Sequence, residues 1–275
     1  MKIGLALSGG GTKGLAHIGV IKVLDKNNIP IDFIAGTSAG AIIGGIYASG
    51  TPIRVLEKKI LSMKRFDFLS FILDFSKPHG GVVEAKRIMK FIESLIEERH
   101  IENFKIGFAA VSADIANFKE VIIDSGDVLS AIRASIAYPG LVKPVKIKDA
   151  VLVDGGIINN FPMDVLAKKN VDFIIGVNFK PISKMKDISY KNVVWKSLKM
   201  MELFLTHYRN KDIKNCIVLE PNVSGISTFS VSEKLARKAI RAGEREAKKM
   251  LPEIKEKIER LKPSSDLNTN FPNSL

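Results

Sequence analysis

The first feature of the sequence that could do chemistry is a serine between two glycines. The segment Gly36-Thr37-Ser38-Ala39-Gly40 follows the apolar run Asp32 to Ala35 and precedes the helix-compatible run Ala41-Ile42-Ile43. A nucleophile elbow needs this strand, turn and helix context, and its flanking glycines leave space for a strained serine backbone. A GxSxG match alone is weak, because glycine and serine are common in turns. In this context the pattern predicts Ser38 as a nucleophile.

A glycine-rich loop, Ser8-Gly9-Gly10-Gly11-Thr12-Lys13-Gly14, joins the first apolar run to a helix expected to begin near Leu15. Its backbone N–H groups would lie at a helix N-terminus, where unpaired donors and the helix dipole favour an anion. The loop is therefore predicted to hold an oxyanion or a phosphate. An oxyanion loop after strand one and a serine after strand two would be neighbours at the carboxyl edge of a parallel sheet, as acyl transfer requires.

The same loop fits GxGxxG at Gly9, Gly11 and Gly14, so a nucleotide-binding enzyme is the main alternative. That motif expects an acidic residue at the carboxyl end of the second strand, about 20 residues further on. Asp32 precedes that strand instead of following it, which argues against a dinucleotide. A Walker A motif is excluded, because Lys13 is followed by glycine instead of serine or threonine.

A serine nucleophile needs a base, usually histidine. None of His17, His79, His100 and His207 has a convincing partner in the sequence, and His17, among apolar residues after the glycine loop, is interpreted as structural. Asp154 is the better candidate. It ends the apolar run Val151-Leu152-Val153 and is followed by Gly155-Gly156, which let backbone approach closely. An aspartate before two glycines is more often a turn former, so the choice between a turn and a catalytic role for Asp154 depends on the other motifs of the sequence.

Four elements in this order resemble the patatin-like phospholipases. They are the loop Gly9-Gly10-Gly11-Thr12-Lys13-Gly14, the elbow Gly36-Thr37-Ser38-Ala39-Gly40, the segment Ala134-Ser135-Ile136-Ala137-Tyr138-Pro139, and Asp154-Gly155-Gly156. The resemblance covers roughly residues 3–180. Lys13 stands where the family often has arginine, which keeps the charge but loses the guanidinium fork.

The resemblance implies a serine acyl hydrolase, that is a carboxylic ester hydrolase, acting on lipid or phospholipid acyl esters through an acyl-enzyme. Ser38 would be the nucleophile, Asp154 its base, and the amides of Gly9, Gly10 and Gly11 the oxyanion hole. The residues expected to support these motifs are Lys13, Gly14, Gly36, Gly40, Gly155 and Gly156. No metal and no cofactor are expected. The fold implied is α/β, with three α/β/α layers around a mainly parallel central sheet.

Alternating short apolar runs and helix-period segments also predict an α/β fold. The predicted strands are 3–7, 33–35, 106–111, 121–123, 151–153, 173–177 and 217–219. The predicted helices are 15–27, 39–49, 83–99, 127–135, 163–169, 193–208 and 231–262, the last divided in two by Pro252. A single domain over residues 1–262 and a disordered tail over 263–275 are expected.

The 275 residues carry a formal net charge of +13. Such an excess attracts nucleic acid or anionic lipid headgroups, or it is only a solvated surface. With the resemblance, no nucleic acid is expected, and a cytoplasmic protein with peripheral association at an anionic inner membrane surface is favoured. Cys216 is interpreted as a core residue, and the glycine-rich stretch 33–50 as a strand, turn and helix instead of a membrane span. A non-catalytic lipid-binding module remains an alternative.

Two apolar segments could contact lipid. Residues 66–75 are predicted to form either a core element or a lid or acyl-chain wall, and the choice stays open. The helix 193–208 carries Trp195, Leu198, Met201 and Leu205 opposite lysines, so it could pack as an ordinary amphipathic helix or contact a bilayer.

Overall fold

The computed structural model describes residues 1–63, 84–179, 190–228 and 232–261. The strands are β1 (Ile3–Leu7), β2 (Phe33–Thr37), β3 (Gly107–Asp114), β4 (Lys119–Ile123), β5 (Val145–Ile147), β6 (Ala150–Asp154), β7 (Phe173–Val177) and β8 (Cys216–Leu219). The helices are α1 (Ala16–Lys26), α2 (Ala39–Ala48), α3 (Ile53–Leu61), α5 (Lys86–Glu93), α6 (Val128–Ser135), α7 (Met163–Ala167), α8 (Tyr190–Asn210) and α9 (Glu233–Leu261). The single-turn 3-10 elements are η1 (Gly11–Leu15), η2 (Ile101–Asn103) and η3 (Gly155–Ile157).

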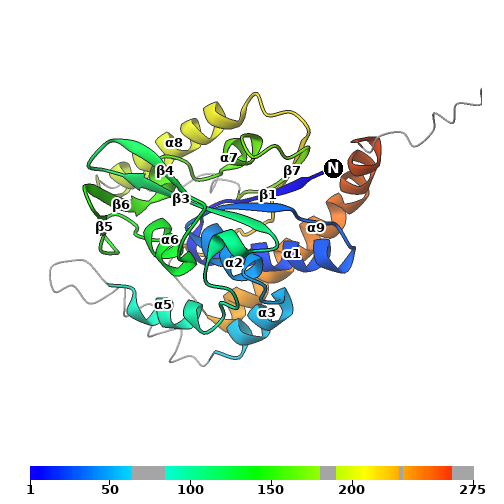
Figure 1. The fold of residues 1–275 in the computed structure, drawn as a ribbon, viewed down its shortest axis with the longest axis horizontal. Coiled ribbons are helices and arrows are strands. Elements are labelled where there is room, and N and C mark those ends of the chain that lie inside the picture. The colour runs from blue at the N-terminus through cyan, green and yellow to red at the C-terminus, as the bar shows by residue number, and fades with distance from the viewer. Residues whose placement is uncertain (64–83, 180–189, 229–231, 262–275) are drawn as a thin grey trace, which may run out of the picture.

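These strands form one mixed sheet whose main part is parallel. Strands β3, β2, β1, β7 and β8 pair in that order, each parallel to its neighbour. The fully buried runs of β1 and β7 fit this arrangement, since parallel strands are covered on both faces. Strands β4 and β6 pair antiparallel to β3, and β5 pairs antiparallel to β6. The predicted three-layer α/β/α fold is confirmed (Figure 1).

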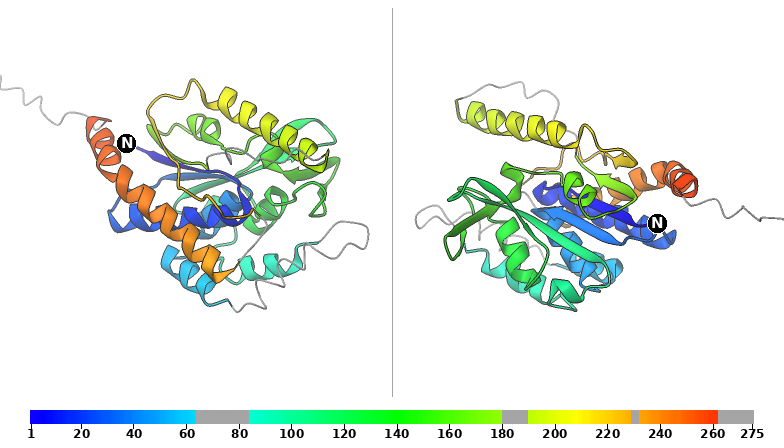
Figure 2. Two further views of the ribbon diagram at one scale, coloured as in Figure 1. Left: turned by 180° about the vertical axis from the view of Figure 1, so that it is seen from behind. Right: turned by 45° about the horizontal axis from the view of Figure 1, so that its top comes forward.

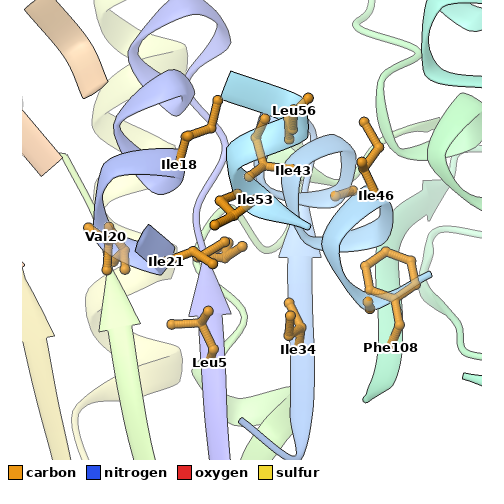
Figure 3. Close-up of a cluster of buried hydrophobic side chains, with 14 of the residues drawn as sticks. Leu5, Ile18, Val20, Ile21, Ile34, Ile43, Ile46, Ile53, Leu56 and Phe108 are labelled. Carbon is orange, nitrogen blue, oxygen red and sulfur yellow. The ribbon is translucent and has the colours of Figure 1, made fainter. Parts of the chain in front are cut away.

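The two faces of the sheet are covered unequally. On one face, Leu5, Ile34 and Phe108 pack against α1, α2 and α3, and Figure 3 shows Leu5 below Ile21 of α1 and Phe108 below Ile46 of α2. The other face carries smaller residues, including three alanines, and packs against α7 and the segment before it. Its core members are Ala6, Ala35, Ala109, Val111, Ile174, Phe161, Met163, Val165 and Leu166. Beyond α7, α8 forms the outer edge of this side (Figures 1 and 2).

Helices α1 and α9 cross so closely that their backbones are in contact. A methyl group added to Gly19 would overlap the carbonyl oxygen of Ile240, and one added to Gly243 would overlap that of Ala16. Glycine on each helix therefore permits the close crossing. Next to it, Lys22 of α1 binds Glu244 of α9 across 222 residues of sequence. The two helices hold the start and the later part of the described chain together.

Several predicted elements need correction. Pro252 does not divide the last helix: α9 runs unbroken from Glu233 to Leu261. An interior proline costs about 3 kcal/mol, and burial of Ala247 before it and of Ile254 and Ile258 after it offsets this cost. Helix α3 and strand β5 were not predicted. The tail 263–275, His79 and residues 66–75, for which the sequence makes predictions, lie outside the described residues.

The predicted helix 83–99 is shorter than expected. Helix α5 covers only Lys86–Glu93, and Ala85 before it adopts a left-handed backbone conformation with φ 57°. Strand β3, by contrast, is longer than predicted, since it continues past Val111 to Asp114. That extension matters for the site, because β6 pairs with it.

Candidate active site

The registers of three strands explain why Ser38 and Asp154 meet. Strand β4 occupies one edge of β3 from Ala110 to Asp114. On the other edge, β2 pairs with β3 as far as Thr37 opposite Val111, and the antiparallel β6 ends with Asp154 opposite Ser112. Since β2 and β6 end against consecutive residues of β3, the residue after β2 and the last residue of β6 come together. Those residues are Ser38 and Asp154.

Ser38 has the strained backbone of an exposed turn serine. Its φ is 53° and its ψ is −116°, a conformation that side-chain-bearing residues rarely adopt. Its N–H donates to the Ser135 hydroxyl at 2.9 Å, and that hydroxyl donates to the carbonyl of Val111 at 2.6 Å. These bonds fix the turn, and the Ser38 residue remains only half-buried.

The flanking glycines of the turn are required by space. A methyl group at Gly36 would lie 2.6 Å from the carbonyl oxygen of Gly40, and one at Gly40 would overlap the carbonyl oxygen of Leu7. The turn therefore closes onto the start of its own helix and onto β1. This packing places Ser38 beside the loop that follows β1.

Asp154 is 2% exposed, and its carboxylate accepts a hydrogen bond from the Gly156 N–H at 2.7 Å. Burial raises the pKa of Asp154 to about 6, while the neighbouring Ser38 side chain and the Gly156 N–H lower it and the charge of Glu202 raises it further. A carboxylate in this state is ionised at neutral pH and is a stronger base than an ordinary aspartate.

The glycine loop lies beside the serine. A Cβ added to Gly9 would lie 3.3 Å from that of Ser38. The Gly9 N–H, however, donates to the carbonyl of Asn160 at 3.0 Å, so the oxyanion role predicted for this amide does not fit the structure. Within the described residues, the N–H groups of Gly10 and Gly11 have no acceptor. They remain the candidate donors.

The remaining motif residues let the glycine loop, the Ser38 turn and the segment after Asp154 pack closely against their neighbours. A methyl group at Gly14 would overlap the Ala39 side chain, so Gly14 lets η1 pack against the start of α2. Gly155 similarly lies against the Val111 carbonyl of β3. Lys13 is half-buried, and its pKa is lowered first by burial and then by the nearby charge of Lys199, while Glu202 raises it. Lys13 thus faces charged residues of α8.

The structural interpretation of His17 fits its contacts. Its ring is fully buried, donates from Nε2 to the carbonyl of Ser8 at 2.8 Å, and packs against Phe179 with ring centroids 5.0 Å apart. Burial lowers its pKa to about 4, so the ring is neutral. It supports the glycine loop, and no hydrogen bond among the described residues joins it to Ser38. Both His100 and His207 are exposed.

Sequence reasoning missed the polar residues behind the turn. The Thr37 hydroxyl donates to the carbonyl of Asn159 at 2.8 Å, and the Asn159 side chain donates to Glu120 at 2.7 Å and to Asp164 at 2.8 Å. Arg209 of α8 pairs with both carboxylates at 2.6 Å. The Asn-Asn pair after Asp154-Gly155-Gly156 was the available signal, but its partners come from distant segments.

Asn160 links α8 to the glycine loop. Its carbonyl accepts the Gly9 N–H, and its side chain donates to Glu202 of α8 at 2.7 Å. Glu202 also pairs with Lys199. Helix α8 is therefore connected to the candidate site through its polar residues.

Comparison with protein families decides the relationship. Residues 5–167 match the family described as patatin-like phospholipase. The chain belongs to the patatin-like phospholipase family. The match contains the glycine loop, Ser38 and Asp154.

Similarity to individual proteins is consistent with membership in this family. The lysophospholipase NTE1 of Debaryomyces hansenii is 28% identical over 238 residues, which cover 86% of this chain and 15% of that protein. An uncharacterised NTE family protein of Mycobacterium tuberculosis is 36% identical over 177 residues, covering 64% of this chain and 49% of that protein. The chain thus spans less than half the length of these relatives. The crystal structure of VipD from Legionella pneumophila has a TM-score of 0.56 at 15% identity, covering 92% of this chain and 67% of that one.

None of the helices in residues 1–63, 84–179, 190–228 and 232–261 has the length and apolarity needed to cross a bilayer. The same residues contain no group of three or more histidine, cysteine, aspartate or glutamate side chains arranged to hold a metal ion.

Proposed function

We propose that the chain is a lipid acyl hydrolase with Ser38 as nucleophile and Asp154 as its base. The observation that carries the proposal is the strand register, which ends β2 and β6 against consecutive residues of β3 and so brings the half-buried Ser38 next to the buried Asp154 carboxylate. Family membership supports the lipid ester as substrate. The same arrangement would suit phospholipids and other fatty acyl esters.

In the proposed reaction, the Asp154 carboxylate takes the hydroxyl proton as the Ser38 oxygen attacks the ester carbonyl carbon. The carbonyl oxygen becomes an oxyanion, which the amides of Gly10 and Gly11 would stabilise. The tetrahedral intermediate collapses, the alcohol leaves with a proton from Asp154, and the acyl group remains on Ser38. Water, deprotonated by Asp154, then attacks this ester. The second tetrahedral intermediate collapses, the Ser38 oxygen leaves and takes the proton back from Asp154, and the fatty acid is released.

The raised pKa of Asp154 supports its role as base. A pKa of about 6 leaves the group mostly ionised at neutral pH, while its affinity for a proton exceeds that of an exposed aspartate. His17 is an unsuitable alternative base, because its Nε2–H is held by a carbonyl and its pKa is about 4. The nucleotide-binding alternative is disfavoured by the end of β2, where Thr37 is followed by Ser38 and α2 instead of the acidic residue that a dinucleotide-binding fold needs.

A serine-directed fluorophosphonate tests the proposal. The intact chain should be labelled and should hydrolyse a short p-nitrophenyl ester, and Ser38→Ala should lose both. The matched control is Ser94→Ala, which removes an exposed serine hydroxyl far from the turn. Thermal unfolding should show that both variants are folded. Labelling and hydrolysis retained in folded Ser38→Ala would disprove the nucleophile, and nucleotide-dependent thermal stabilisation without labelling would favour the alternative.

A further inference from the structure

Helix α8 carries a set of large apolar side chains that are exposed to solvent. Its exposed large residues are Val193 at 43%, Met200 at 74%, Met201 at 60%, Phe204 at 69% and Tyr208 at 61%. Their spacing of three, four or seven residues places them on one face of a helix. We call these five residues the α8 stripe. Such a stripe normally packs against the protein core, so its exposure needs an explanation.

The opposite face of α8 is attached to the protein by polar contacts. Glu202 accepts from Asn160, Arg209 pairs with Glu120 and Asp164, and the Asn210 side chain donates to the carbonyl of Phe161 at 3.0 Å. These contacts fix which face is turned outward. The stripe shares Met201 with the apolar face that the sequence suggested.

The stripe adjoins the candidate active site. Its neighbour Glu202 binds Asn160, whose carbonyl holds Gly9 of the glycine loop. Ile157, in the turn directly after Asp154-Gly155-Gly156, is also 44% exposed, and this turn contacts α8. Apolar exposure thus continues from α8 to the segment that carries Asp154. A surface that covered the stripe would lie next to the reacting groups.

Charge around the stripe favours an anionic partner. Residues 190–214 contain six lysines and arginines and two acidic residues. The acidic Glu202 is already paired with Lys199. At the end of the stripe, the Lys211 ammonium lies 4.7 Å from the centre of the Tyr208 ring, which joins a cation directly to the apolar face. Apolar side chains flanked by lysines match the boundary between acyl chains and anionic headgroups.

We infer that the α8 stripe docks the protein on an anionic lipid bilayer, with the candidate active site facing the lipid. The choice of a bilayer instead of a second protein rests on the proposed lipid substrate and on the charge of the segment. Docking would spare a substrate lipid from crossing open water before it reaches Ser38.

The test is co-sedimentation of the full chain with vesicles of phosphatidylcholine alone or mixed with phosphatidylglycerol. The test variant is Met200→Gln/Phe204→Gln, because glutamine is a good helix former and both positions are exposed. Wild type should bind the anionic vesicles, and the double variant should bind them at least about tenfold more weakly. The matched control is Val55→Gln on α3, an exposed apolar residue on the other side of the sheet, and it should bind like wild type.

Hydrolysis of a soluble short ester separates this inference from the proposed function. The double variant should keep that activity, which also shows that it is folded, and Ser38→Ala should keep vesicle binding. Unchanged vesicle binding by the double variant would overturn the inference, as would equal binding of wild type to both vesicles or to neither. A dimer that the double variant dissociates, without any change in vesicle binding, would assign the stripe to a second copy.

Discussion

The candidate active site and helix α8 meet at Asn160, yet they are built in opposite ways. Around Ser38, backbone packs against backbone, the glycines at 36 and 40 leave no space for a side chain, and Asp154 is buried. On α8, polar side chains make the attachment and apolar side chains face outward. The difference suggests a division of tasks: the first region would perform the chemistry, and the second would bring it to the lipid.

Asp154→Asn should produce the largest effect on hydrolysis, because it changes the chemistry of the candidate active site and leaves helix α8 unchanged. The amide keeps the volume but cannot take the Ser38 proton, so kcat/KM should fall about 10³- to 10⁴-fold, for soluble and vesicle-bound esters alike. Steady-state hydrolysis of p-nitrophenyl butyrate measures this. The control His207→Gln changes an exposed histidine of α8 and should remain active. Near-normal hydrolysis by folded Asp154→Asn would remove Asp154 as the base.

Gly40→Ala tests the packing difference through stability. The added methyl group would overlap the Leu7 carbonyl oxygen, so the free energy of unfolding should fall by about 3 kcal/mol. Ser197→Ala, at an exposed position of α8, should change it by less than about 0.5 kcal/mol. Urea unfolding monitored by circular dichroism compares the two. Equal effects would mean that the regions are equally tolerant.

The pH dependence of Asp154 gives a third test. Since burial raises its pKa to about 6, kcat/KM should rise as the pH increases through about 6 and then level off. Because the pKa is higher in the folded than in the unfolded chain, ionisation of Asp154 opposes folding, and its stabilising contribution, present below about pH 4, is lost as the pH rises through 6. Relative to wild type, Asp154→Asn should therefore gain about 3 kcal/mol of stability between pH 4 and pH 7. A constant difference across this range would contradict the raised pKa.

Glu202→Gln should have the smallest effect, because it acts where the two regions meet. Removing this negative charge removes one of the causes that raise the pKa of Asp154, so the acid limb of the pH profile should shift to lower pH. Glutamine keeps an oxygen for the Asn160 side chain. The matched control Glu246→Gln, on α9, should leave the profile in place. An upward shift would show that Glu202 acts on Asp154 in another way.

The sequence predicted the elements whose signals are local. Glycines around Ser38 and after Asp154 mark tight backbone contacts, and the buried runs of β1 and β7 mark a parallel sheet. It could not predict contacts that depend on distant segments. The division of one β3 edge between β2 and β6, and the use of the Gly9 amide by Asn160, follow from strand pairing over long separations. For the helix 193–208, the choice between ordinary packing and contact with a bilayer stayed open, because helical periodicity gives the apolar face but not what that face contacts.

The crossing of α1 and α9 has a consequence for how the protein is synthesised. Lys22 and Glu244, whose ion pair joins the two helices, are 222 residues apart in the sequence. The Thr12 N–H of η1 likewise donates to the carbonyl of Thr228, a residue that is synthesised much later. At about 5–20 residues per second, a ribosome needs about 10–40 s to cover that separation. During this interval the glycine loop lacks its later partners. A nascent chain would therefore carry Ser38 for many seconds before the loop beside it could be held in place.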